Sequence, residues 1–137
     1  MSFGEKLAPL VGRILLASLF LLSGIGKLQH WNDVALAMAR HGVTNIGPLL
    51  AASVAIEIGA GFGLVIGFRT RIMALMLCMF TLVVSFVMHD FWTIGDADLA
   101  STQMQLFAKN IAIAGGLLVL VGMGGGSWSY DSLRADD

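Results

Sequence analysis

Charged side chains are scarce in this sequence. Asp, Glu, Lys and Arg make up 12% of the 137 residues, whereas 57% of the residues are hydrophobic. A water-soluble domain typically has about 25% charged residues. This chain has too few of them to cover the surface of a soluble globule of its size. The composition therefore indicates an integral membrane protein, with the lipid bilayer as its main surroundings.

Cysteine is almost absent, since Cys78 is the only one. A single cysteine excludes an internal disulfide, a Cys-x-x-Cys redox pair and a cysteine-rich metal site, and we expect no metal centre. The formal net charge of −1 gives no sign of a basic surface for nucleic acid. We find no nucleotide motif and no nucleophile paired with a base. Enzymatic activity is therefore undecided, no catalytic residue can be named, and a protein that is not an enzyme on its own is favoured.

Hydrophobic runs long enough to cross a bilayer dominate the chain. A spanning helix needs about 17–25 mostly apolar residues, and the runs that qualify are residues 7–26, 47–68, 72–88 and 104–123. Between the first two, Trp31 and a segment with apolar residues at helical spacing predict a short helix in the membrane interface. We therefore predict an all-α integral membrane four-helix bundle, formed by residues 1–137 as a single domain, with a short interfacial helix between spans one and two.

Helix starts and orientation follow from local signals. Thr102 and Gln105 have the spacing of a capping box, which predicts that the fourth helix opens near residue 104. The side of the membrane that holds both termini has the larger share of basic residues in short segments, namely Lys6, Arg69, Arg71 and Arg134. Because basic loops stay in the cytoplasm, we expect both termini to be cytoplasmic and the acidic loop after the third span to lie outside.

Small residues predict where the helices pack. In lipid, close approach of backbones depends on small side chains, and the second span has them at every fourth position: Ala51, Ala55, Gly59, Gly63 and Gly67. The fourth span has Ala108, Ala112 and Gly116. We expect these stripes to be contact faces, either within one chain or between copies in a homo-oligomer. Arg13, near one end of the first span, is expected to extend to the membrane interface.

Ionisable and polar residues converge on the outer half of the predicted bundle. Glu57 lies about 15 Å along its span and is the acidic residue deepest in the apolar runs, so it needs a partner or a proton. Both Lys27 and Lys109 lie toward the same side and are open as partners. The candidate cofactor-binding cavity comprises Glu57, His89, Trp92, Lys109 and Asn110, with Lys27 and Asp90 nearby. A purely structural ion pair explains Glu57 equally well.

Several short motifs occur in one order along nearly the whole chain. They are Gly12-Arg13, Ser23-Gly24-Ile25-Gly26-Lys27-Leu28, Glu57, Gly67-Phe68-Arg69-Thr70-Arg71, His89-Asp90-Phe91-Trp92, Phe107-Ala108-Lys109-Asn110, and the glycine-rich close at residues 124–131. In this order and spacing, the sequence resembles the DoxX family of small bacterial inner-membrane proteins. The resemblance implies a multi-pass protein of the inner (cytoplasmic) membrane. The family takes its name from a subunit associated with thiosulfate:quinone oxidoreductase, and other relatives are linked to thiol or oxidative-stress defence.

These observations leave two main hypotheses for function. In the first, the chain is a non-catalytic subunit or scaffold that docks protein partners in a membrane redox or stress-defence complex. In the second, the cavity binds a quinone or another small amphipathic molecule, as a subunit of an oxidoreductase of the thiosulfate:quinone type. A haem held by His30 and His89 is a weaker third hypothesis, because bis-histidine ligation needs facing helices and His30 lies in a connection.

Overall fold

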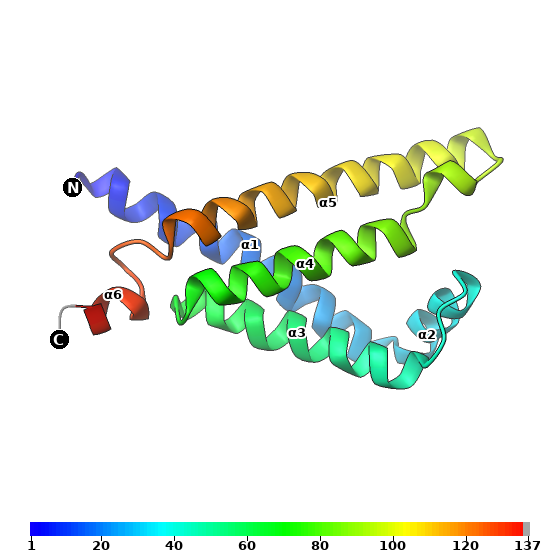
Figure 1. The fold of residues 1–137 in the computed structure, drawn as a ribbon, viewed down its shortest axis with the longest axis horizontal. Coiled ribbons are helices and arrows are strands. Elements are labelled where there is room, and N and C mark those ends of the chain that lie inside the picture. The colour runs from blue at the N-terminus through cyan, green and yellow to red at the C-terminus, as the bar shows by residue number, and fades with distance from the viewer. Residues whose placement is uncertain (136–137) are drawn as a thin grey trace.

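The computed structural model describes residues 1–135, and within them the chain is helical with no strand. Helices long and apolar enough to cross a membrane are α1 (Phe3–Gln29), α3 (Ile46–Ile66), α4 (Thr70–Met88) and α5 (Ala97–Met123). The shorter elements are α2 (Trp31–Arg40), η1 (Phe91–Thr93) and α6 (Tyr130–Ala135). The prediction of a helical membrane bundle, with a short helix between the first two spans, is confirmed (Figure 1).

The long helices form two pairs. α1 packs along α3, and α4 packs along α5, while α3 and α4 are joined by a tight turn. Figure 1 shows that both termini lie at the same end as this turn, and that the pairs diverge toward the other end, where α2 and η1 lie. We call these the terminal end and the loop end.

The core lies between the pairs and is continuous over the terminal half. It is built from apolar side chains of all four long helices, including Ala17, Phe20, Leu64, Leu77 and Leu117. Many large apolar side chains instead point outward, as expected where the surroundings are lipid rather than water. The bundle therefore contacts the hydrocarbon chains around most of its circumference.

The small-residue stripe on α3 does not pack within the chain as predicted. Ala51, Ala55 and Gly59 are exposed, and a methyl group at Gly59 would meet no atom within 4 Å. The buried face of α3 instead carries Val54 and Glu57, about 140° and 200° around the helix from Gly59. Only the end of the stripe is buried, at Gly63 and Gly67, because there the α3–α4 turn brings the chain back against it. On α5, Ala108 and Ala112 are likewise exposed.

The fourth spanning helix begins earlier than the capping-box pattern predicted. Asp96 is its N-cap, and the side chain of Asp96 accepts a hydrogen bond of 2.8 Å from the Leu99 backbone N–H. Thr102 lies inside the helix and donates to the Asp98 carbonyl at 3.1 Å. Aspartate before an acidic first turn was the stronger start signal. With 27 residues, α5 is about 40 Å long, so it extends past a hydrocarbon core of about 30 Å.

Arg13 is buried at the terminal end, and the expectation that it reaches the interface is wrong. Its side chain is fully inaccessible. It donates hydrogen bonds to the Leu64 carbonyl at 2.8 Å and to the Trp128 carbonyl after α5. The last carbonyls of a helix lack intrahelical partners, so Arg13 satisfies the end of α3 from α1. Gly67 has φ 72°, and any side chain there would collide with the guanidinium.

Two further polar contacts close the terminal end. The Asp131 carboxylate accepts hydrogen bonds from the backbone N–H groups of Arg69 at 2.7 Å and Thr70 at 2.8 Å, and so caps α4. Burial by itself raises the pKa of Asp131, but these hydrogen bonds and the Arg13 guanidinium hold it below its ordinary value. Arg71 donates to the carbonyls of Val121 and Gly122 at the end of α5. Each of the four long helices is thereby tied to another at this end.

Packing at Gly24 and Gly59 gives a direct test of this fold. A Cβ at Gly24 would lie 2.7 Å from Ile58 Cγ1 and 3.3 Å from Glu57 Cβ, whereas one at Gly59 would meet open space. We expect Gly24→Leu to lower the free energy of unfolding by about 1–3 kcal/mol or more, because the added side chain overpacks the contact between α1 and α3. Gly59→Leu should leave it unchanged or raise it slightly, because leucine favours helix over glycine. Thermal unfolding in detergent, followed by circular dichroism, measures both, and equal losses would contradict the helix pairing.

Candidate ligand-binding cavity

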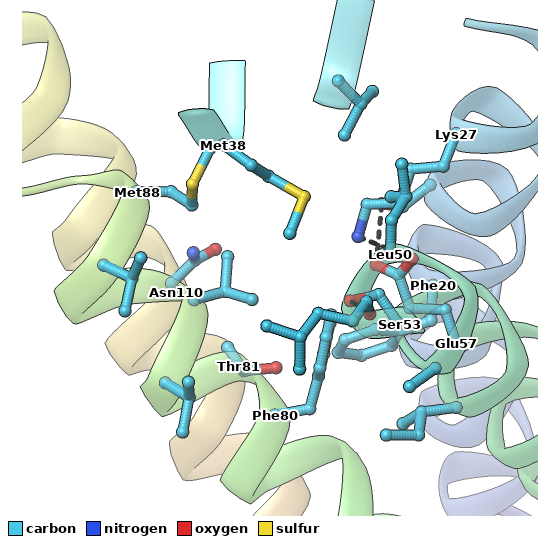
Figure 2. Close-up of a pocket in the computed structure, with 18 of the residues that line it drawn as sticks. Phe20, Lys27, Met38, Leu50, Ser53, Glu57, Phe80, Thr81, Met88 and Asn110 are labelled. Carbon is cyan, nitrogen blue, oxygen red and sulfur yellow. Dashed lines mark hydrogen bonds and ion pairs between the residues drawn. The ribbon is translucent and has the colours of Figure 1, made fainter. Parts of the chain in front are cut away.

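A cavity of about 550 Å³ lies where the two helix pairs diverge. Its walls come from α1 and α3 on one side and from α4 and α5 on the other, and α2 lies across its outer part (Figure 2). Most of the lining is apolar, with Leu50, Phe80 and Ile113 among the larger side chains. This volume falls within the range of about 300–1,000 Å³ that is usual for small-molecule sites.

One wall carries a buried polar cluster. Lys27 Nζ lies 2.8 Å from Glu57 Oε2, and the Ser23 hydroxyl donates a hydrogen bond of 2.8 Å to Glu57 Oε1. Ser23 and Lys27 are four residues apart on α1, so both point to the same side of that helix. The Glu57 side chain is only 4% exposed. Lys27 Nζ also lies 5.0 Å from the centroid of the Phe80 ring, a cation–π contact across the cavity from α4.

The ion pair resolves which lysine serves Glu57. Lys27 is the partner in the structure, whereas Lys109 is exposed on α5 and does not line the cavity. Adjacent residues of a helix point about 100° apart. Asn110 faces the cavity, so its neighbour Lys109 points to a different side of α5, toward the outside of the bundle.

The opposite wall offers polar groups from α4 and α5. Asn110, Thr81 and His89 all line the cavity. The Thr81 hydroxyl donates to the Leu77 carbonyl at 2.7 Å within α4, and His89 Nδ1 lies 2.8 Å from Gln103 Oε1. The Asn110 amide makes no side-chain hydrogen bond to the described part of the chain, so both its donor and its acceptor face the cavity unused.

Two other residues predicted for this site lie elsewhere, as Lys109 does. Trp92, in η1, packs in an aromatic group at the loop end, with ring centroids 5.2–6.1 Å from those of Phe86, Phe91 and Phe107. Asp90 faces His41 of the segment after α2, at 3.5 Å. Neither side chain lines the cavity. This corrects the expected position of Trp92, and Asp90, which was expected nearby, lies between α4 and η1 beside His41.

Two contributors to this site were not predicted from the sequence. Ser23 completes the polar cluster. Its position could have been predicted from the sequence, because a serine one helical turn before Lys27 lies on the same face of the helix. α2 contributes Val34 and Met38, and Val43 follows it. No sequence pattern showed that this helix lies over the cavity, because its position depends on tertiary packing.

Comparison with known proteins supplies the family. The DoxX family model matches residues 8–90, a segment that contains most of α1, all of α2 to α4, and the residues Ser23, Lys27, Glu57 and His89. The chain belongs to the DoxX family. Inner membrane protein YqjF of Escherichia coli is 35% identical over 129 residues, covering 94% of this chain and 93% of that protein. Inner membrane protein YphA of the same organism is 34% identical over 125 residues, covering 89% and 86%. No solved structure matches the chain.

These findings agree with the four apolar helices. A DoxX-family chain with helices of this length and hydropathy, and with inner-membrane relatives, is a multi-pass protein of the inner membrane. The family resemblance in the sequence is confirmed. The relatives' names give a membrane and no ligand, so the chemistry of the cavity has to be argued from its own residues.

The Lys27–Glu57 ion pair predicts a non-additive double mutant. We expect Lys27→Met to lower the free energy of unfolding by about 3 kcal/mol or more, because it leaves Glu57 buried without its cation. Adding Glu57→Gln should recover part of that loss. Thermal and denaturant unfolding in detergent micelles provide the measurement.

The exposed Lys109 is the matched control for this test. Lys109→Met should change stability by no more than about 0.5 kcal/mol, alone or combined with Glu57→Gln. Additive losses for Lys27→Met and Glu57→Gln, or a rescue seen with Lys109→Met instead, would show that the pair is not formed in the membrane protein.

Proposed function

We propose that this DoxX-family protein binds a small amphipathic molecule of the membrane, of the quinone class, in the cavity between its helix pairs. The observation that carries the proposal is the combination of apolar walls with a few converging polar groups between the spanning helices. Such a composition is characteristic of small-molecule sites. Glu57 lies near the middle of α3, so the polar cluster is reached from the hydrocarbon region more readily than from bulk water.

The polar groups fit a head that accepts hydrogen bonds. Lys27 Nζ and the unused Asn110 amide are donors on opposite walls, suited to two carbonyl oxygens on one ring. Phe80 lies beside Lys27 and offers an aromatic face for stacking. Glu57 balances the charge of Lys27 at 2.8 Å, so an uncharged ligand can approach the cluster without leaving a net charge in the membrane. Leu19, Val83 and other lining residues that are also exposed leave room for an apolar tail toward the lipid.

A role as a non-catalytic subunit or scaffold of a membrane redox or stress-defence complex is our second proposal. It is favoured by the small-residue face Ala51, Ala55 and Gly59 on α3, which this chain leaves uncovered. Small residues of this kind allow close contact between membrane helices, so a partner protein or a second copy fits there. Cytoplasmic termini remain our prediction for its orientation, from the basic residues at the terminal end.

Ligand recovery tests the first proposal. The protein is purified from membranes in mild detergent, extracted with organic solvent, and the extract is quantified by mass spectrometry. We expect about one lipid-soluble molecule of a single class per chain, clearly above the background from bulk lipid. Ser53 lines the cavity beside Glu57, and Ser53→Phe should reduce recovery strongly, because the added ring occupies the site.

The matched control lies on the same helix. Ala55 is exposed and does not line the cavity, so Ala55→Phe should retain the ligand. Extracts that contain only bulk lipid, or equal recovery from both variants, would contradict ligand binding in this cavity. The same preparation tests the second proposal: a protein recovered in fixed ratio with the chain supports it, and a chain always recovered alone contradicts it.

A further inference from the structure

α2 covers the loop-end side of the cavity and is held only lightly. None of its residues is buried, and its packing contacts are with α1 and α3. Its inner face contributes Val34 and Met38 to the lining, and Figure 2 shows Met38 projecting over the space between the walls. α2 therefore lies between the cavity and the loop end of the bundle.

The connection after α2 has the features of a hinge. Gly42 has φ 76° and Asn45 has φ 53°, both in the left-handed region, which glycine and asparagine tolerate best. Residues 41–45 separate α2 from α3 without regular structure. At its other end α2 follows α1 after the single residue His30, so changes of φ or ψ at His30 and in residues 41–45 together would let α2 move relative to both spanning helices.

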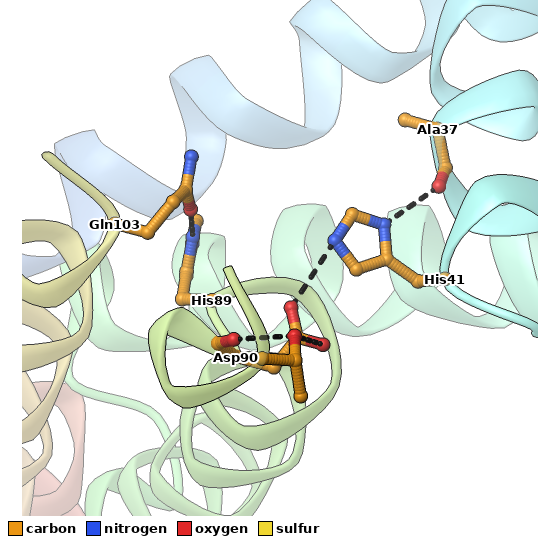
Figure 3. Close-up of polar contacts among 6 residues, drawn as sticks. Ala37, His41, His89, Asp90 and Gln103 are labelled. Carbon is orange, nitrogen blue, oxygen red and sulfur yellow. Dashed lines mark hydrogen bonds and ion pairs between the residues drawn. The ribbon is translucent and has the colours of Figure 1, made fainter. Parts of the chain in front are cut away.

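His41, directly after α2, connects this helix to the α4–α5 pair. Its Nδ1 lies 2.9 Å from the Ala37 carbonyl oxygen, and its Nε2 lies 3.5 Å from Asp90 Oδ1 (Figure 3). Asp90 stands at the end of α4, just before η1. Within residues 1–135, this is the one polar side-chain contact between the α2 segment and the α4–α5 pair.

Both partners of the imidazole are acceptors. A carbonyl oxygen and a carboxylate cannot donate, so each ring nitrogen of His41 must carry a hydrogen for both contacts to be favourable. Only the protonated, positively charged imidazole has two N–H groups. A neutral ring satisfies only one of the two contacts. With its hydrogen on Nδ1 it turns a lone pair toward the Asp90 carboxylate, and with its hydrogen on Nε2 it turns a lone pair toward the Ala37 carbonyl and loses the charge attraction to Asp90. The closed arrangement therefore fits the imidazolium form.

The surrounding charges leave Asp90 as the decisive partner. Lys27 on α1 is paired with Glu57 on α3, and His89 is engaged by Gln103. The other charged groups on this side are Asp33 and Arg40 on α2 itself, and Asp96, Asp98 and Lys109 at or in α5. None of these lies within ion-pair distance of His41, and Asp90 does.

We propose that α2 is a lid on the cavity and that His41 and Asp90 form its latch, closed when His41 is protonated and released when it is neutral. This inference rests on the proposed function, because it regulates access to the same cavity. Histidine changes its charge between about pH 5 and 8, so acidification of the loop-end side closes the lid. The His41 and Asp90 side chains are each 29% exposed, so protons reach them from the water.

The lid position can be measured as a distance between spin labels. The labels are placed at Ala39 on α2 and Ser101 on α5, both exposed, as cysteines in a Cys78→Ala background. Double electron–electron resonance in detergent, without added ligand, then gives the distance distribution at pH 5 and pH 8. We expect a longer and broader distribution at pH 8. The closed population should fall by up to about fivefold, since a partly exposed ion pair is weak.

Variants separate the latch from a general effect of pH. His41→Gln and Asp90→Asn should both abolish the pH response and give the open distribution at pH 5. His30→Gln removes the histidine at the other end of α2 and should keep the wild-type response. No shift in the wild type, or a shift that survives in His41→Gln, would overturn the latch.

The outcome also distinguishes the latch from the ligand proposal. A lid that responds to pH in a chain from which no ligand is ever extracted contradicts ligand binding and leaves the latch standing. A ligand recovered from a chain in which α2 does not move with pH supports ligand binding and contradicts the latch.

Discussion

The hydrogen bonds of the buried Arg13 side chain hold the terminal end of the bundle together, and the positions of the other helices depend on them. The last carbonyls of a helix lack intrahelical partners, and where protein covers them, as around the inaccessible Arg13 side chain, a protein donor must satisfy them. One guanidinium from α1 satisfies carbonyls at the end of α3 and, through Trp128, fixes the glycine-rich segment that follows α5. That segment positions Asp131 to cap α4, and Gly67 leaves the space the guanidinium needs. The four long helices are therefore held together firmly at the terminal end.

Because the bundle is fixed at the terminal end, the helix pairs can diverge toward the loop end, and the cavity lies where they diverge. Where α1 and α3 diverge from α4 and α5, the space is lined by apolar side chains and by the Ser23–Lys27–Glu57 cluster. The carboxylate would be costly there by itself, but two hydrogen-bonding partners offset much of that cost. A cluster without net charge, next to the amide of Asn110, suits an uncharged ligand with a polar head. α2, over the same opening, gives the protein a means of controlling access to it.

Much of this fold could be predicted from the sequence, while the site could be predicted only in part. The spans follow from length and hydropathy, and the need of Glu57 for a cation follows from its depth. Helical spacing shows which residues share a face but not which helices are neighbours, so Lys27 and Lys109 could not be separated as partners. For the same reason, helical spacing could not show that the stripe is exposed as far as Gly59 and buried from Gly63, or that Arg13 is buried. The His41–Asp90 contact joins residues 49 positions apart and depends on tertiary structure alone.

We propose that the space between the helix pairs is a ligand site. The decisive measurement is a cryo-electron microscopy structure of the chain taken from its membrane directly into lipid nanodiscs, with a rigid binding domain added for size. The proposal predicts ordered non-protein density between the Lys27–Glu57 pair and Asn110, with the helix pairs diverging at the loop end. Helix pairs closed against each other, with side chains filling the space and no such density, would contradict it.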